Sequence, residues 1–372
     1  MLATKKILGL LGHQISYSLS PLMHNKAAEL LGLEYIYVPF DLASPERLEA
    51  ALDGVRTLGI AGLNVTVPYK EKVMKYLDTL SPEAAEAEAV NTIVNQEGTL
   101  IGYNTDITGF GEPLKPYKAE LKNAAVAIFG NGGAARAVIE SLRNEFDVSA
   151  IHLIVRNEEK AAVLRESLER RSKNLIVEVH NIVDAKTANV LRAVKLIVNA
   201  TPVGTAHVDA THHLSAVQTS AGHEELYADP SVFSAGQLVY DLTYHPPMTP
   251  LLITAAGQGA TVISGLEMLL AQGAKAFELW TGHAMPVAQV RPFLVAALEA
   301  PFVEAAPVHP VESAVKKSAA KSATKVKFRK VKLDDGTAAA TEPAGLNSLK
   351  QEISKNELAE KKDETEELEE GN

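Results

Sequence analysis

The chain has 372 residues, which is room for two domains of ordinary size and a remainder. It contains no cysteine, so disulfides, thiolate catalysis and cysteine-ligated metal sites are excluded. The net charge of −10 does not favour general nucleic-acid binding by the core, and no apolar run reaches the ~18 residues that a membrane span needs.

The first 106 residues alternate predicted strands with predicted helices. The lysines near the N-terminus are not followed by a signal-peptide pattern, so we expect a cytoplasmic protein. We predict strands at 7–11, 35–40 and 62–67, helices at 21–31 and 45–52, and a hairpin of strands 91–95 and 99–103 joined across 96–98.

From residue 124 the alternation becomes regular. We predict strands at 124–129, 151–155, 175–179, 196–198 and 238–241, with helices at 134–143 and 158–170. Strands that alternate with helices imply a parallel sheet covered by helices. The chain is therefore predicted to be an α/β protein.

A glycine-rich turn joins the strand at 124–129 to the next helix. Gly130 allows a tight turn, Gly132 allows the backbone to approach a pyrophosphate, and the small Ala135 allows the helix to pack closely on the strand. The N–H groups at a helix N-terminus bind anions, because that end of the helix dipole is positive. In this strand–turn–helix context the motif predicts dinucleotide binding.

The end of the following strand bears on which dinucleotide is bound. Arg156 stands where an acidic residue usually takes the ribose 2′-hydroxyl of NAD, and Lys160 follows one turn later. Two cations suit a 2′-phosphate, so NADP is favoured. NAD stays possible, because Glu158 or Glu159 could reach a ribose hydroxyl.

Four segments of the N-terminal half carry polar residues in turns. Ser20 is predicted as the N-cap of a helix with Pro21 at its first position, which leaves Ser18 unexplained. Lys70 follows a strand, and Asn91 begins one. Asp106 follows an Asx turn before a helix.

Together with later motifs, these segments closely resemble the shikimate dehydrogenase family. The matching pieces occur in family order over nearly all of 1–300: SYSLSPLMHN, GLNVTVPYK, AVNTI, GYNTD, GNGGAARA, NATPVG, YDLTYHPPMTPLL and GLEMLLAQGAKAFELW. The resemblance implies a reversible, NADP-dependent reduction of 3-dehydroshikimate to shikimate, in aromatic amino-acid biosynthesis. It also implies an N-terminal substrate domain at 1–106, completed by helices at 265–300, and a Rossmann-type NADP-binding domain at 107–264.

The resemblance also implies roles for individual residues. Lys70 would be the general acid/base, paired with Asp106. The substrate-binding residues would be Ser18 and Ser20 for the carboxylate, Tyr244 near it, Thr66, Asn91, Asp106 and Gln272 for the ring hydroxyls, and Asn64 in support. Asn199, Thr201 and Gly265 would lie along the cofactor cleft, beside Gly130, Gly132, Gly133, Ala134, Arg156 and Lys160.

Two alternatives stay open. The first is a quinate or mixed quinate/shikimate dehydrogenase that uses NAD or NADP; quinate carries an extra hydroxyl on the carbon that bears the carboxylate. The second is a nucleotide-sensing homologue without catalysis, against which the intact Lys70 and Asp106 argue. Tyr17 stands where histidine is common in the family, and Arg156 is flanked by Val155 and Asn157 where Asn and Thr are typical.

The segments outside these motifs are less informative. Residues 205–237 look like an enlarged loop with four histidines at irregular spacing, so no metal site is predicted. Residues 301–372 are rich in Ala, Lys, Ser and Glu and poor in aromatics, which predicts a disordered tail of unknown partner. The expected partner of the core is a small-molecule substrate, and we expect a monomer or a homodimer.

Overall fold

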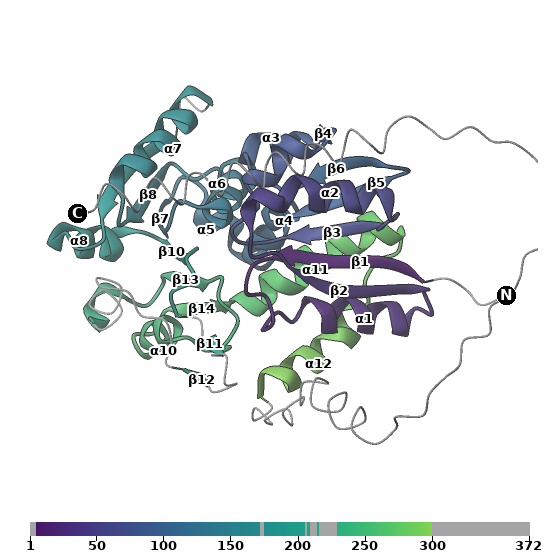
Figure 1. Ribbon diagram of the computed structural model, residues 1–372. Helices are drawn as coiled ribbons and strands as arrows, with labels where there is room; N and C mark the ends of the chain where they lie inside the picture. Colours follow the sequence, from purple (N-terminus) through teal and green to yellow (C-terminus); the bar gives the residue numbers. More distant parts are fainter. Residues whose placement is uncertain (1–4, 172–174, 205–206, 209–213, 216–228, 300–372) are drawn as a thin grey trace, which may run out of the picture. The chain divides into compact units, whose positions relative to one another are not determined.

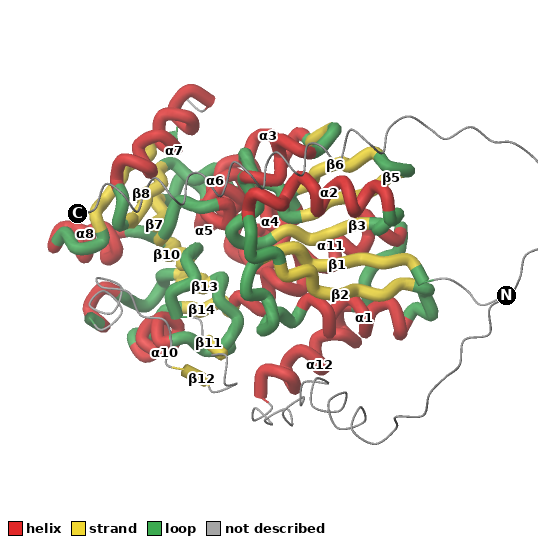
Figure 2. Tube along the Cα trace, viewed as in Figure 1, coloured by secondary structure: helices red, strands yellow, loops and turns green. Residues whose placement is uncertain are grey.

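The computed structural model describes residues 5–171, 175–204, 207–208, 214–215 and 229–299. The described residues form an α/β protein with two six-stranded sheets and flanking helices, which confirms the predicted class (Figures 1 and 2). Within these residues, no helix is both long enough and apolar enough to cross a membrane. The predicted tail at 301–372 lies outside the described residues.

The N-terminal sheet has the strand order β2-β1-β3-β5-β6-β4. Its strands are β1 (Lys6–Gly12), β2 (Tyr35–Asp41), β3 (Gly62–Val65), β4 (Thr79–Leu80), β5 (Thr92–Gln96) and β6 (Thr99–Tyr103). The helices between them are α1 (Ser20–Leu30), η1 (Pro45–Arg47), α2 (Leu48–Thr57), η2 (Lys72–Tyr76) and α3 (Pro82–Ala87). Strands β2 and β3 pair with β1 in parallel, and β5 pairs antiparallel with both β3 and β6.

Most predicted elements of this half are present, with shifted ends. The hairpin is confirmed, and its turn is tighter than predicted because Gln96 pairs with Thr99. The strand predicted at 62–67 ends at Val65, three residues before Pro68, and a proline cannot donate to a ladder. The helix predicted at 45–52 begins as the short 3-10 helix η1 and continues to Thr57 as α2.

The second sheet is parallel throughout, with the order β14-β13-β10-β7-β8-β9. Its strands are β7 (Ala125–Phe129), β8 (Ala150–Val155), β9 (Ile176–Asn181), β10 (Leu196–Asn199), β13 (Leu238–Asp241) and β14 (Thr261–Ser264). The helices between them are α6 (Gly133–Glu145), α7 (Glu158–Arg171), α8 (Ala185–Ala193), η4 (Pro230–Val232) and α10 (Pro250–Gly257). The short strands β11 (His207–Val208) and β12 (Leu214–Ser215) pair with each other in the segment predicted as an enlarged loop.

The core of the second sheet has a layer on each face. Along β7, Val126 and Ile128 belong to one buried cluster, whereas Ala127 and Phe129 belong to another. Because successive side chains of a strand point to opposite faces, both faces must be apolar. This explains why the strands of this half are continuous apolar runs in the sequence.

Two groups of helices connect the halves. Helix α4 (Thr105–Gly111), η3 (Glu112–Tyr117) and α5 (Lys118–Leu121) lead from β6 to β7, and α11 (Gly265–Thr281) and α12 (Val287–Glu299) follow β14. Helix α11 runs behind the strands of the N-terminal sheet in Figure 1, where Trp280 donates a hydrogen bond to the Ile93 carbonyl (2.9 Å). Near its start, Met268 instead joins a core cluster of the second sheet. The domain division at 106 and 264 stays a prediction.

Candidate active site

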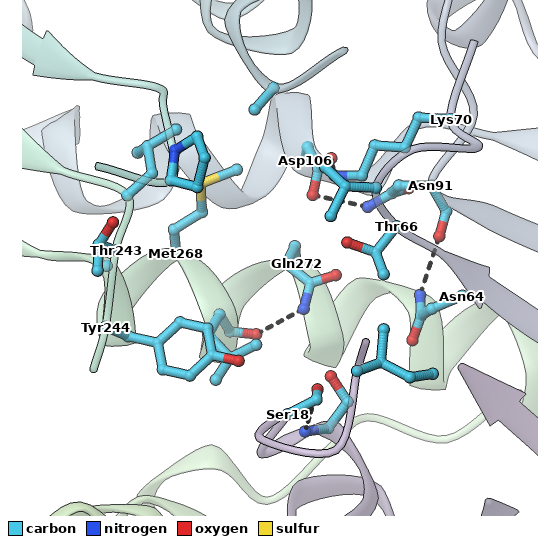
Figure 3. A pocket seen from close by; sticks show the side chains of 18 of the residues that line it. Ser18, Asn64, Thr66, Lys70, Asn91, Asp106, Thr243, Tyr244, Met268 and Gln272 are labelled. Atoms are coloured by element: carbon cyan, nitrogen blue, oxygen red, sulfur yellow. Dashed lines mark hydrogen bonds and ion pairs between the residues drawn. The ribbon is translucent and has the colours of Figure 1, made fainter. Parts of the chain in front are cut away.

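A pocket lies where loops and helices from both halves of the described chain meet (Figure 3). Twelve of the predicted site residues line it: Ser18, Ser20, Asn64, Thr66, Lys70, Asn91, Asp106, Ala134, Thr201, Tyr244, Gly265 and Gln272. Six do not: Gly130, Gly132, Gly133, Arg156, Lys160 and Asn199. The sequence motifs, which are far apart along the chain, therefore converge on one cavity.

An ion pair between Lys70 and Asp106 lies on one wall of the pocket. The Lys70 Nζ and Asp106 Oδ2 atoms are 2.6 Å apart, and the two side chains are 17% and 6% exposed. Lys70 stands in the loop after β3. Asp106 stands in the first turn of α4, where the Asn104 side chain caps the helix by accepting from the Asp106 N–H (3.1 Å). The local fold thus aims a carboxylate at a lysine 36 residues away.

Asn91 fixes the other oxygen of Asp106. Its Nδ2 donates to Asp106 Oδ1 (2.7 Å) and to Thr105 Oγ1 (2.9 Å), and its Oδ1 accepts from the Thr105 N–H (2.7 Å) and from Thr92 Oγ1 (3.0 Å). All four residues are buried. A buried polar network with its groups paired is rigid, so the orientation of the carboxylate is set before any ligand binds.

Asn64 is held by the protein from both ends of its amide. Its Oδ1 accepts from the Tyr37 hydroxyl (2.8 Å), and its Nδ2 donates to the Asn91 carbonyl (3.2 Å) and to Thr92 Oγ1 (3.1 Å). Both amide hydrogens therefore have protein partners. Figure 3 shows Asn64 beneath Asn91, in keeping with the predicted supporting role.

The serine segment before α1 differs from the prediction in one respect. Ser20 is the first residue of the helix and not its N-cap; the cap position is Leu19, which has no side-chain capping bond. Ser18 supplies the hydroxyl instead, because its Oγ accepts from the Ser20 N–H (3.2 Å). Pro21 falls within the first turn, where its missing N–H has no intrahelical partner to lose.

Tyr244 lies across the pocket from the ion pair (Figure 3). Burial, followed by the neighbouring Tyr17 phenol, raises the pKa of Tyr244 to about 12, although a hydrogen bond with Ser18 acts the other way. The phenol is therefore protonated at neutral pH and can donate. Tyr17 also lines the pocket, and burial raises its pKa as well.

Gln272 projects into the pocket from α11. Its Nε2 donates to the Leu269 carbonyl (2.9 Å), which fixes the side chain against its own helix. Helices α4 and α11 touch at this point, because a Cβ added to Gly109 would lie 2.5 Å from the Gln272 Cβ. Sequence reasoning missed most of the apolar residues that line the pocket. These are Leu10, Ile15, Val65, Val67, Leu242 and Met268.

The glycine turn after β7 lies next to the wall of the pocket that holds Lys70 and Asp106. Gly130 has φ +104°, which L side chains rarely adopt. Gly132 is the N-cap of α6; it provides no side-chain cap, and a Cβ added there would meet nothing within 4 Å. A Cβ added to Gly133 would lie 3.2 Å from the Lys70 Cβ. The N-terminus of α6 therefore offers an open, uncapped anion site beside Lys70.

Arg156 and Lys160 follow the neighbouring strand β8 and are both exposed. The Asn157 side chain begins α7 by accepting from the Lys160 N–H (2.9 Å). Of the two acids weighed against NADP, Glu158 is engaged elsewhere, because its Oε1 accepts from Asn181 Nδ2 (2.7 Å). Strands β7 and β8 are parallel neighbours, so both cations and the glycine turn lie at the carboxyl edge of the sheet.

Asn199 is buried and does not line the pocket, but it holds Thr201, which does. Its Oδ1 accepts from Thr201 Oγ1 (2.7 Å), and its Nδ2 donates to Asp241 Oδ1 (2.9 Å). Asp241, which the sequence did not single out, also accepts from Thr249 Oγ1 (2.6 Å). Burial raises the pKa of Asp241 to about 6, against hydrogen bonds from Thr249, Thr243 and Asn199 that lower it.

Gly265 begins α11 where two backbones meet. A Cβ at this position would lie 2.3 Å from the Leu242 carbonyl oxygen, so only glycine fits. The residue lines the pocket, and its place along a cofactor cleft stays a prediction. Of the four loop histidines, His212, His213, His223 and the side chain of His207 lie outside the described residues.

The sequence of this chain is similar to those of proteins with known names. Residues 10–93 match the model of the shikimate dehydrogenase substrate binding domain, and residues 265–292 match that of the shikimate 5'-dehydrogenase C-terminal domain. A relative from Chlorobaculum tepidum named shikimate dehydrogenase (NADP(+)) is 47% identical, over 80% of this chain and 97% of the relative. The chain belongs to the shikimate dehydrogenase family. The resemblance of its motifs is thereby confirmed.

Solved structures of the shikimate dehydrogenase family agree with this fold. A crystal structure of a shikimate dehydrogenase in complex with NADP+ matches with a TM-score of 0.68 and 33% identity, over 81% of this chain and 100% of that chain. A quinate dehydrogenase from Corynebacterium glutamicum in complex with NAD also matches with a TM-score of 0.68, at 28% identity, over 79% of this chain and 100% of that chain.

Proposed function

We propose that this member of the shikimate dehydrogenase family reversibly reduces 3-dehydroshikimate to shikimate with NADP. The observation that carries the proposal is the ion pair between the half-buried Lys70 and the buried Asp106, 2.6 Å apart, in a pocket bordered by the uncapped N-terminus of α6. Relatives across the family that are named shikimate dehydrogenase (NADP(+)) support the same substrate and cofactor.

The chemistry follows from the residues of the pocket. When bound, the reduced cofactor NADPH would supply the hydride for ketone reduction, and the oxidised form NADP⁺ would accept it in the reverse reaction. Reduction of a ketone leaves an alkoxide, which the Lys70 ammonium stabilises and protonates. Asp106 orients the lysine, and Asn91 holds Asp106 through its second oxygen. In the oxidative direction Lys70 takes the proton from the substrate hydroxyl.

Substrate recognition is assigned to polar groups around this pair. Ser18, Ser20 and the protonated Tyr244 offer donors for a carboxylate, as expected from the family. Thr66, Asn91, Asp106 and Gln272 hold ring hydroxyls, whereas Asn64 positions Asn91. A site built of such polar pairs discriminates strongly, because a ligand that lacks a hydroxyl leaves buried groups unpaired.

The residues present fit NADP. An added Cβ at Gly132 would stand in open space, so the backbone can approach a pyrophosphate closely. Exposed Arg156 and Lys160 suit a 2′-phosphate, and the bond between Glu158 and Asn181 removes one of the two acids that would favour NAD. The similarity to a quinate dehydrogenase in complex with NAD is the reason to test quinate and NAD beside shikimate and NADP.

The deciding experiment measures absorbance at 340 nm with shikimate and quinate, each paired with NADP and NAD. We expect strong turnover with shikimate and NADP. Preference for quinate would be consistent with the proposed acid–base pair but would contradict shikimate as the substrate. Binding of NADP without turnover of either substrate would favour the nucleotide-sensing alternative.

The NADP assignment has its own test in Arg156→Gln. Loss of the guanidinium should raise the KM for NADP by roughly tenfold or more and leave the KM for NAD unchanged, because only NADP carries the 2′-phosphate. Arg170→Gln, on an exposed residue in the last turn of α7, is the matched control. An equal effect on both cofactors would contradict the assignment.

A further inference from the structure

Three metal-ligating side chains gather on the second sheet, away from the pocket. His152 on β8 pairs in register with Glu178 on β9, and His180 follows two residues later. Residues two apart on a strand point to the same face, so all three side chains project together. Their exposed fractions are 17%, 53% and 20%, which leaves the two imidazoles largely enclosed and the carboxylate open to solvent.

The ligand atoms form a small triangle. His152 Nδ1 lies 3.0 Å from His180 Nε2 and 3.3 Å from Glu178 Oε2, and His180 Nε2 lies 3.4 Å from the same carboxylate oxygen. Zinc binds imidazole nitrogen and carboxylate oxygen at about 2.0–2.2 Å in tetrahedral geometry, which puts neighbouring ligand atoms about 3.3–3.5 Å apart. The triangle therefore matches one face of a zinc tetrahedron with little rearrangement.

We propose that His152, Glu178 and His180 bind a zinc ion through three protein ligands, with the fourth position open to solvent. Two imidazoles and a carboxylate are donors that suit Zn²⁺. None of the three residues lines the pocket described above, so the ion has no part in the proposed hydride transfer. Strand β9 ends the sheet, and an ion shared between β8 and β9 would fasten this outer strand to its neighbour.

The sequence alone conceals this cluster. The two histidines are 28 residues apart, and only the parallel pairing of β8 with β9 brings them together. In the sequence, the histidines that stand close together are those of 205–237, which are irregularly spaced and lie mostly outside the described residues.

The test uses untagged full-length protein freed of metal by a chelator, with Co²⁺ as the probe. We expect one Co²⁺ per chain, with the intense visible absorption of a four-coordinate site, displaced by an equivalent of Zn²⁺. His152→Ala and His180→Ala should each weaken Co²⁺ binding by more than about tenfold. His283→Ala, on an exposed histidine after α11, should bind as the unaltered chain does.

Thermal unfolding gives a second readout. Zn²⁺ should raise the Tm of the unaltered chain and of His283→Ala but not of His180→Ala, because a ligand stabilises only the state that binds it. Glu178→Gln, on a half-exposed side chain, preserves the fold and should also weaken Co²⁺ binding. Undiminished binding in Glu178→Gln, His152→Ala or His180→Ala, or no binding by the unaltered chain, would overturn the proposal.

Discussion

At the scale of residues, the proposed acid–base pair depends on neighbours that leave it little freedom. Lys70 contacts Asp106 on one side, and its aliphatic stem packs against Gly133 on the other. Asp106 is in turn held by Asn91. A substitution that keeps the stem but removes the charge should therefore report on chemistry more than on packing.

Lys70→Met is that substitution. We expect kcat for shikimate oxidation to fall by roughly 10²–10⁴-fold, the usual contribution of general acid–base catalysis, with little change in NADP affinity. Steady-state kinetics and a cofactor-binding titration measure the two effects. Lys72→Met, on an exposed lysine two residues away, should keep full activity. A Lys70→Met enzyme with near-normal kcat would remove Lys70 from its proposed role.

Asp241 predicts a pH dependence of stability. Burial raises its pKa from the ordinary 3.8 to about 6, so the native chain holds this proton more tightly than the unfolded chain does. The contribution to stability is greatest below about pH 4, declines as the pH rises to about 6, and is flat above, with a total change on the order of 3 kcal/mol. Asp241→Asn cannot titrate and should lack this decline.

Urea unfolding of both chains between pH 4.5 and 7 measures the difference in slope. Asp53→Asn, on an exposed carboxylate of α2, is the control and should follow the unaltered chain. Parallel pH profiles for Asp241→Asn and the unaltered chain would show that burial does not hold the proton.

The sequence predicted the polar residues that meet in the pocket, but it missed several of the side chains that hold them in place. Lys70, Asn91 and Asp106 stood in family motifs, and their side chains meet in the structure. The roles of Thr105 and Tyr37 were not predicted, because their hydrogen-bond partners Asn91 and Asn64 are 14 and 27 residues away in the sequence. Such partners become visible only when strand register is known, which periodicity does not provide.

At the scale of elements, the strand–turn–helix unit of β7 and α6 was predicted to within a few residues, because glycine punctuation and apolar runs are local signals. The N-terminus of α1 was predicted less well. Ser18 and Ser20 are both candidates to supply a hydroxyl there, and only the backbone geometry decides which one does. The short strands β4, β11 and β12 also carry no sequence signal that distinguishes them from loops.

Gly132→Ala tests the proposed anion site at α6. The residue has extended backbone angles (φ −87°, ψ −170°) and open space around the added methyl group, so the Tm should hardly change. The methyl group would instead stand where a pyrophosphate approaches, and we expect KM for NADP to rise by roughly tenfold or more. Thermal unfolding and kinetics give the two numbers. Gly54→Ala on α2, also with open space, is the matched control. A large loss of Tm with unchanged KM would contradict this reading.

At the scale of the whole molecule, every described residue that lines the pocket lies between Leu10 and Gln272. Deletion of 301–372 should therefore leave kcat and both KM values for shikimate and NADP within about twofold of the full chain. Kinetics of the two purified chains side by side measure this. A marked loss of turnover would give the tail a part in catalysis. The expected cytoplasmic location and the choice between monomer and homodimer stay predictions.

Trp280 is the chain's sole tryptophan, and it lies on the helix that also bears Gln272. Its indole packs edge-on against His24 (ring centroids 5.3 Å apart) and donates to a β5 carbonyl. The tryptophan emission of the protein therefore comes from one site between α11 and the N-terminal sheet. Because a reduced nicotinamide absorbs where indole emits, quenching of this native fluorophore would report cofactor occupancy without a label and independently of turnover.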